Sequence, residues 1–149
     1  MADIEVKMGD LKLAQNSDNL IALGIGSCLI ITFYDSGLKI GVLAHAMLPC
    51  RKPGTWDHSA KYVDSAMDEM LRKIESFGGE KANLECKLVG GANMFSNITL
   101  DIGKENILSA KKKLKENGIK LVAESTGGSV GKSLGFNVAT GIVDVKIRF

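Results

Sequence analysis

Residues 29–45 read LIITFYDSGLKIGVLAH, and this stretch indicates the class of fold to which the chain belongs. Its two apolar runs, residues 29–34 and 38–45, flank the tripeptide Asp35-Ser36-Gly37. Apolar, β-branched runs separated by a short polar segment that contains glycine are typical of two antiparallel strands joined by a tight turn. The stretch therefore predicts a β-hairpin, and with it antiparallel strand pairing.

Shorter alternations of apolar and polar residues surround this hairpin. Those before it are formed by Ile4, Val6 and Met8, by Leu11 and Leu13, and by residues 19–23. Those after it cover residues 84–88, 119–123, 134–138 and 143–149. A period of two predicts strands with one buried face, so Cys86 is expected to be a core thiol and Phe149 to share the apolar face of the last strand.

Two longer segments have the three- and four-residue apolar spacing of helices. The first is marked by Val63, Met67, Met70, Leu71, Ile74 and Phe77, and it is followed by glycines at 78 and 79. The second covers about residues 103–117, with Ile107, Leu108 and Leu114 expected to face inward, and Gly118 follows it. Glycine directly after such a segment predicts the end of a helix, and the methionines are interpreted as core filling.

Many short strands, mostly linked by hairpins, together with two substantial helices are typical of an α+β fold. We expect a layered sandwich of mainly antiparallel β-sheet covered by the two main helices, in contrast to the alternating strand–helix order of a nucleotide-binding fold. No internal repeat or linker composition interrupts the chain, so one domain over residues 1–149 is predicted.

Composition excludes several classes of protein. A net charge of +2 is too small to indicate a nucleic-acid partner. No apolar run approaches the length that spans a bilayer, and the N-terminus is acidic, so the cytoplasm is the expected location, without membrane insertion. The scattered Cys28, Cys50, Cys86, His45 and His58 lack the spacing of a metal site, so free thiols and no metal or other cofactor are predicted.

Two glycine-rich motifs resemble nucleotide sites only superficially. Residues 126–133, TGGSVGKS, have Thr126 where a phosphate-binding loop requires its first glycine, and a strand is predicted where a helix should follow. The pair Gly24 and Gly26 lacks the third glycine and the following helix of a dinucleotide site. Both interpretations are rejected.

One cysteine and one histidine have the context of a reactive pair. Cys28 follows the sequence Gly24-Ile25-Gly26-Ser27 between two predicted strands, where a sharp turn can expose a thiol and aim backbone N–H groups at an oxyanion. Counting out and back around Ser36 places His45 close to Leu29 across the hairpin, within reach of the turn. The alternative is that Cys28 is a core thiol and His45 a buried structural imidazole. A register shift of one residue would also turn the His45 side chain to the opposite face of the sheet.

Five blocks in order resemble those of the chemoreceptor glutamine deamidase family, CheD, over about residues 5–147. They are residues 23–28 (LGIGSC), 44–49 (AHAMLP), 61–64 (KYVD), 90–95 (GGANMF) and 124–128 (ESTGG). The resemblance implies hydrolysis of receptor glutamine side chains to glutamate, with a reported activity on glutamyl methyl esters. It also implies a chemoreceptor cytoplasmic helical domain and a CheC-type phosphatase as partners, and a fold similar to toxin-type cysteine deamidases.

Carried over by position, the resemblance makes Cys28 the nucleophile and His45 the general base and acid, with the turn at Gly26 and Ser27 supporting the oxyanion. The family's third catalytic residue is a threonine, but Ala22 stands at that position and has no hydroxyl to orient the imidazole.

The basic residue after the Thr126–Gly127 block, usually arginine in the family, is Lys132, which together with Thr126 and Gly127 is a candidate substrate anchor. Because of Ala22, a catalytically weakened module that binds receptors or the phosphatase is the alternative function.

Overall fold

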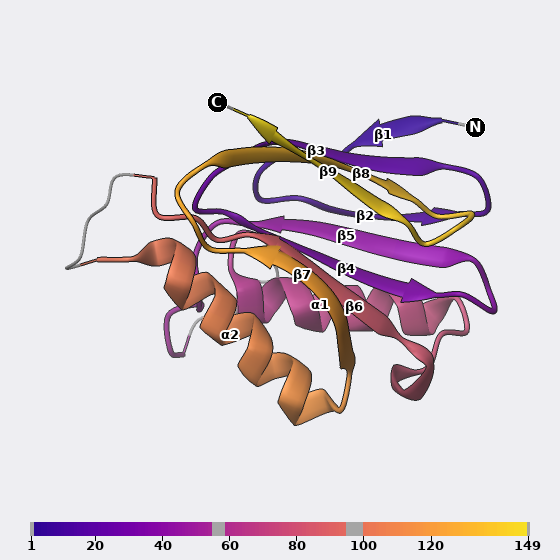
Figure 1. The fold of residues 1–149 in the computed structure, drawn as a ribbon. Helices are drawn as coiled ribbons and strands as arrows, with labels where there is room; N and C mark the ends of the chain where they lie inside the picture. The colour runs from indigo at the N-terminus through magenta and orange to yellow at the C-terminus, as the bar shows by residue number, and fades with distance from the viewer. Residues whose placement is uncertain (1, 55–58, 95–99, 149) are drawn as a thin grey trace.

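The computed structural model describes residues 2–54, 59–94 and 100–148, and it arranges them in three layers (Figure 1). A four-stranded sheet with the order β1-β3-β8-β9 lies on a five-stranded sheet with the order β2-β5-β4-β6-β7. Helices α1 (Val63–Ser76) and α2 (Ile102–Asn117) cover the opposite face of the five-stranded sheet. The predicted α+β layered architecture is confirmed.

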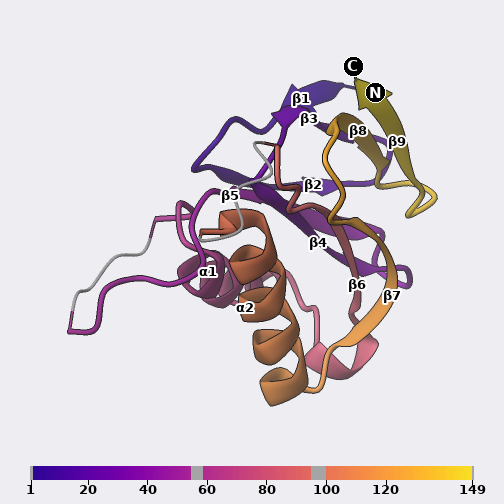
Figure 2. The ribbon, with the colours of Figure 1, turned by 60° about the vertical axis from the view of Figure 1, so that its left-hand side comes forward.

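The strands are short, as the alternations predicted. In the four-stranded sheet they are β1 (Asp3–Glu5), β3 (Asn19–Ile25), β8 (Gly131–Asn137) and β9 (Val143–Arg148). In the five-stranded sheet they are β2 (Leu11–Gln15), β5 (Ile40–Ala46), β4 (Leu29–Asp35), β6 (Glu85–Gly90) and β7 (Lys120–Thr126). Figure 2 shows both helices on one side of the five-stranded sheet and both chain ends at the four-stranded sheet.

Strand pairing is mainly antiparallel, with two exceptions. Strand β1 pairs parallel to β3, and β6 pairs parallel to β7. The second exception follows from α2, which connects β6 to β7: a connection long enough to hold a helix returns the chain to the same end of the sheet. The chain therefore contains one strand–helix–strand unit that its hairpin-rich pattern did not predict.

The central hairpin has both faces buried, because helices cover one face and the other sheet covers the second. All residues of β4 and β5 are buried, which explains their nearly continuous apolar sequence. Leu29, Ile31 and Phe33 of β4 pack in the helix-facing core, whereas Ile30 and Tyr34 pack in the core between the sheets.

The hairpin register brings His45 opposite Ile30 and places Leu29 opposite Ala46. His45 therefore does lie close to Leu29, as predicted. The turn comprises the four residues between Asp35 and Ile40, and Asp35 Oδ1 accepts a hydrogen bond from the Leu38 N–H at 3.0 Å. This register decides that His45 points, like Ile30, into the space between the two sheets.

The helices largely match their predicted extents, but two inward-facing predictions are wrong. Phe77 lies past the end of α1 and is 47% exposed, and Leu108 is 51% exposed. Leu108 follows directly after Ile107, and two consecutive residues cannot both occupy one narrow buried stripe of a helix. The residues that α2 does bury are Gly103, Asn106, Ala110 and Leu114.

Other details of the pattern are settled by burial. Met67 and Met70 are fully buried, which confirms them as core filling, and Cys86 is fully buried as a core thiol. Met8 is exposed in the turn that follows β1, so its predicted place on a buried strand face is wrong. Gly118 ends α2 with a φ of 66°, as predicted. The predictions for His58 and Phe149 lie outside the described residues.

Candidate active site

The turn that carries Cys28 connects the end of β3 to the start of β4. A bulge between Ala22 and Ile25 breaks the pairing of β3 with β8, and Gly24 has a φ of 64°, which glycine adopts without strain. Ser27 is exposed at the tip, while Cys28 is 8% exposed. The thiol therefore lies at the surface end of the inter-sheet space.

The three carbonyl oxygens of residues 26–28 each accept a hydrogen bond from another part of the chain. Gly26 O accepts from Ala92 N at 3.0 Å, and Cys28 O accepts from Gly91 N at 2.8 Å. Ser27 O accepts from the Asn106 side-chain amide at 2.9 Å. In a trans peptide the N–H points away from the preceding carbonyl, so these contacts also orient the N–H groups of Ser27 and Cys28.

Those two N–H groups have no acceptor in any other described residue. An oxyanion-binding turn needs N–H groups that are not committed to other acceptors. The close approach of the turn to β6 depends on Gly90, because a Cβ atom there would collide with the Cys28 carbonyl oxygen.

His45 is buried on β5 with its imidazole held by a backbone carbonyl. Its Nδ1 lies 3.2 Å from Val6 O. A carbonyl oxygen only accepts, so Nδ1 carries the hydrogen in the neutral ring and Nε2 is left as the basic nitrogen. Nε2 has no hydrogen-bond partner among the described residues.

Cys28 directly precedes β4, and His45 lies near the end of the neighbouring strand β5. Ile30, directly opposite His45, packs between the sheets, and Cys28 lies two residues before Ile30. Residues at such diagonal positions of an antiparallel pair have Cα atoms roughly 7–8 Å apart. The register thus places the predicted nucleophile and base at neighbouring positions, without a hydrogen bond between Nε2 and the Cys28 thiol.

Burial keeps both groups neutral. Desolvation raises the pKa of the Cys28 thiol, an effect that its own backbone N–H partly offsets. Desolvation lowers the pKa of His45, which the hydrogen bond to Val6 partly offsets. Both directions favour the neutral forms, a thiol and an imidazole.

Ala22 is fully buried in the inter-sheet core, in the same apolar cluster as Val6. The N–H of Val6 donates to Ile21 O at 2.8 Å, so the carbonyl that orients the imidazole is itself anchored to β3. The imidazole is thus held by a backbone carbonyl, and Ala22 supplies no hydroxyl to it.

The three candidate anchoring residues all have partners within the chain. Lys132 is buried, and its Nζ donates to Ser125 O at 2.9 Å and to Ser125 Oγ at 3.0 Å, which links β8 to β7. Thr126 Oγ1 donates to Glu124 Oε1 at 2.6 Å. Gly127 N donates to Gly90 O at 2.9 Å. Their contribution to substrate binding stays a prediction.

A pocket of about 330 Å³ lies beside Ser27. Its walls are formed by Ala92, Asn93 and Met94, by Leu100 and Asp101 before α2, and by the first two residues of α2, Ile102 and Gly103. Asp101 caps this helix by accepting a hydrogen bond from Lys104 N at 3.0 Å. The volume is within the range of small-molecule pockets, so an amide side chain fits beside the turn.

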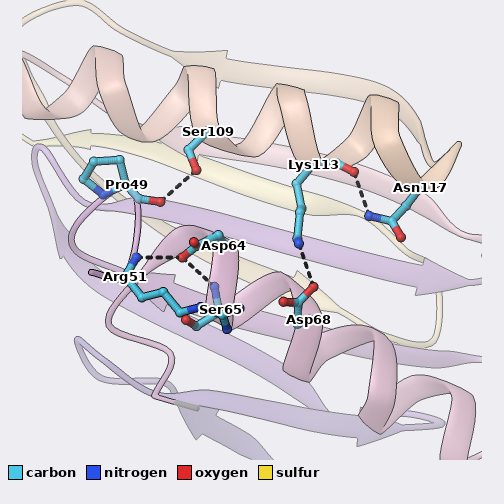
Figure 3. Close-up of polar contacts among 8 residues, drawn as sticks. All are labelled: Pro49, Arg51, Asp64, Ser65, Asp68, Ser109, Lys113 and Asn117. Atoms are coloured by element: carbon cyan, nitrogen blue, oxygen red, sulfur yellow. Dashed lines mark hydrogen bonds and ion pairs between the residues drawn. The ribbon is translucent and has the colours of Figure 1, made fainter. Parts of the chain in front are cut away.

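The loop that follows His45 is anchored to both helices (Figure 3). Ser109 Oγ of α2 donates to Pro49 O at 2.7 Å, and Arg51 N donates to Asp64 Oδ1 of α1 at 3.0 Å. The helices themselves are joined by an ion pair of 2.9 Å between Lys113 and Asp68. The end of β5 that carries His45 is therefore followed by a loop that both helices hold in place.

Sequence reasoning missed two residues of this site. The Val6 carbonyl has no signal in the sequence, because backbone groups are present at every position. Asn106 did have a signal: it lies at helical spacing from Ala110 and Leu114, so a polar residue occupies the buried stripe of α2. Within the described ranges, no cluster of three or more potential ligands could hold a metal ion, and no helix has the length and apolar character to cross a bilayer.

Comparison with known proteins gives a consistent result. Residues 47–147 match the family model described as CheD chemotactic sensory transduction. A probable chemoreceptor glutamine deamidase CheD of Pyrococcus abyssi is 40% identical over 97% of this chain and 91% of its own length. A probable chemoreceptor glutamine deamidase CheD 1 of Methanosarcina acetivorans is 39% identical over 98% and 94%, respectively. The chemoreceptor glutamine deamidase CheD of Thermotoga maritima is 37% identical over 91% and 86%.

Proposed function

Because the chain belongs to the CheD family, we propose that it hydrolyses the carboxamide of glutamine side chains on the cytoplasmic helical domain of chemoreceptors. The observation that carries the proposal is the imidazole of His45, held through Nδ1 by the Val6 carbonyl on the strand paired with the one that Cys28 precedes. The names of the full-length relatives support the choice of substrate. The proposed site of action is the cytoplasm, where the receptor domain lies.

In the first half of the reaction, Nε2 of His45 removes the proton of the Cys28 thiol as the sulfur attacks the carboxamide carbon. The tetrahedral oxyanion accepts hydrogen bonds from the N–H groups of Ser27 and Cys28, which have no other acceptor among the described residues. The C–N bond then breaks, and His45 gives the proton to the departing nitrogen. Ammonia is released, and the glutamyl side chain stays bound to Cys28 as a thioester.

In the second half, the neutral imidazole removes a proton from water as the water attacks the thioester carbon. The C–S bond breaks, and the proton returns from His45 to the sulfur, which leaves a glutamate side chain and the resting thiol. No cofactor takes part in these steps. A glutamyl methyl ester presents the same acyl carbon with methanol as leaving group, so we extend the proposal to receptor esterase activity.

Two finer elements complete the proposal. Lys132, Thr126 and Gly127 border the site and position the receptor backbone, with Lys132 contributing from its place between the sheets. A CheC-type phosphatase is the proposed protein partner, on the basis of the family alone.

The alternative is a module that binds receptors or the phosphatase without catalysis. Ala22 favours this alternative, since the hydroxyl of the family's third residue is absent. The Val6 carbonyl weighs against it, because that carbonyl orients the imidazole without a hydroxyl.

The deciding experiment incubates the protein with the purified cytoplasmic domain of a receptor from the same organism. Mass spectrometry should find individual glutamines converted to glutamate, with an equivalent release of ammonia. The Cys28→Ala variant is the control and should convert none. Tight receptor binding by the wild type without conversion of any glutamine would establish the binding module in place of the enzyme.

A further inference from the structure

Asn106 is a fully buried amide that joins two segments of the site across long separations in sequence. Its Nδ2 donates to Ser27 O at 2.9 Å and to Met47 O at 3.1 Å. Ser27 immediately precedes the nucleophile, and Met47 follows the end of β5, two residues after His45. One side chain of α2 thus holds both chain segments that carry the reactive pair.

This amide is unusual for its place in the helix. The other buried residues of α2 are glycine, alanine and leucine, and asparagine is a poor choice for a helix interior. Both neighbours of the amide nitrogen are carbonyl oxygens, which only accept, so the orientation of the amide is determined by its partners. Its Oδ1 is buried without a hydrogen-bond partner among the described residues. Burying an unpaired polar atom costs free energy, and an apolar side chain would fill this position without that cost.

The contact with Ser27 O has a geometric consequence for catalysis. A trans peptide is planar, with its C=O and N–H directed oppositely, so holding Ser27 O against α2 directs the Cys28 N–H away from the helix. That N–H is one of the two donors without an acceptor in another described residue. The two neighbouring carbonyls, Gly26 O and Cys28 O, are held by backbone groups, so among the described residues Asn106 supplies the side-chain hydrogen bond to a carbonyl of this turn.

We propose that Asn106 is a positioning residue, which aims the Cys28 N–H at the oxyanion by holding the Ser27 carbonyl and ties this turn to the end of the His45 strand. The inference rests on the proposed function for its biological meaning, but the chemistry it describes is acyl transfer to Cys28 in general. It can therefore be tested without a receptor.

The test compares two reactions of Cys28 in a Cys50→Ala background, which removes the exposed thiol. Acylation by p-nitrophenyl acetate forms a Cys28 Sγ–C bond, breaks the bond to p-nitrophenolate and passes through an oxyanion. Alkylation by iodoacetamide displaces iodide at a saturated carbon and passes through none. A lost oxyanion donor should thus slow the first reaction and spare the second.

For Asn106→Ala, we expect acylation to slow by roughly 100-fold, the usual effect of a misplaced oxyanion donor, with alkylation within about twofold of wild type and the same pH profile. Asn106→Asp keeps the side-chain volume and tests the inference even if the alanine variant does not fold. Its carboxyl, protonated among carbonyl oxygens, retains one donor, so an intermediate loss is expected.

The matched control is Asn117→Ala, which removes another asparagine amide of α2, one that donates to Lys113 O at 2.9 Å at the opposite end of the helix. It should leave both rates unchanged. Unchanged acylation in a folded Asn106 variant would overturn the inference. So would acylation and alkylation that change in parallel, which indicates a loosened scaffold, or a wild type whose Cys28 is not acylated. Absence of receptor deamidation alone would refute the proposed function and leave this comparison intact.

Discussion

The two faces of the five-stranded sheet each bury one cysteine, and they differ in almost everything else. The helix-facing core around Cys86 is built from aliphatic and aromatic side chains and methionines. The inter-sheet face contains an apolar cluster as well, but it also buries His45, Thr32 and the stem of Lys132. The helix side buries polar groups of its own, Ser65 of α1 and Asn106 of α2, so what sets the inter-sheet face apart is the buried imidazole of His45.

This difference shows what makes a buried thiol useful. Burial raises the pKa of both cysteines, and that of Cys86 far above its ordinary range. Cys86 lies mid-strand, where its neighbours are apolar. Cys28 lies where a strand begins, beside N–H groups without acceptors in other described residues and next to the strand that carries an oriented imidazole. Under the proposed mechanism, position at a strand end is what separates a reactive thiol from a structural one.

The strongest test of the comparison removes each thiol in turn. Cys28→Ala should lower receptor deamidation by at least ~10⁴-fold, as loss of a nucleophile does in comparable enzymes. Cys86→Ala should leave the rate of the folded protein within about twofold and lower its free energy of unfolding by about 1 kcal/mol through the small cavity. The rates are measured by ammonia release. Equal losses in the two variants would remove the functional distinction between the faces.

A second test removes the imidazole from the inter-sheet face. His45→Ala should lower the deamidation rate by ~10²–10⁴-fold, because the general base and acid is lost. The control is Thr32→Val on the same face, whose hydroxyl makes only a 3.4 Å contact with Lys87 O. It should keep the wild-type rate. An active His45→Ala protein would mean that the histidine is a core residue like Thr32.

A third test restores the family's threonine with Ala22→Thr. Since the Val6 carbonyl already accepts from Nδ1, we expect the rate to change by less than about threefold. Position 22 is fully buried, so a hydroxyl without a partner should lower the free energy of unfolding by about 1–3 kcal/mol. Urea denaturation and ammonia release measure the two effects. A large gain in rate would show that the carbonyl orients the imidazole poorly.

The smallest effect concerns stability at alkaline pH. The folded-state pKa of Cys86 is raised, so above the unfolded value of about 8.5 only the unfolded chain releases this proton, and stability falls by about 1.4 kcal/mol per pH unit for such a group. Below that pH the contribution is fully present. Cys86→Ala should reduce the decline between pH 8.5 and 10.5, as measured by urea denaturation under reducing conditions. Identical slopes in both proteins would contradict the assignment.

Much of the layered fold was evident from local patterns. The hairpin at residues 29–45, the helix-ending glycines and the methionine stripe of α1 each depend on spacing along a few residues, and each was predicted correctly. The errors at Met8, Phe77 and Leu108 all concern which side chains become exposed where an element ends or turns. Burial at such points depends on neighbours that are distant in sequence.

The sequence alone therefore determined the strand and helix segments, the glycine turn before Cys28 and the nearness of His45, because short-range periodicity and turn chemistry encode them. Only the tertiary structure decided which sheet face His45 occupies, since one residue of register reverses it. The tertiary structure also supplied the Val6 carbonyl and the Asn106 amide from segments far from Cys28 in sequence. Such contacts arise from the packing of layers, which no local pattern records.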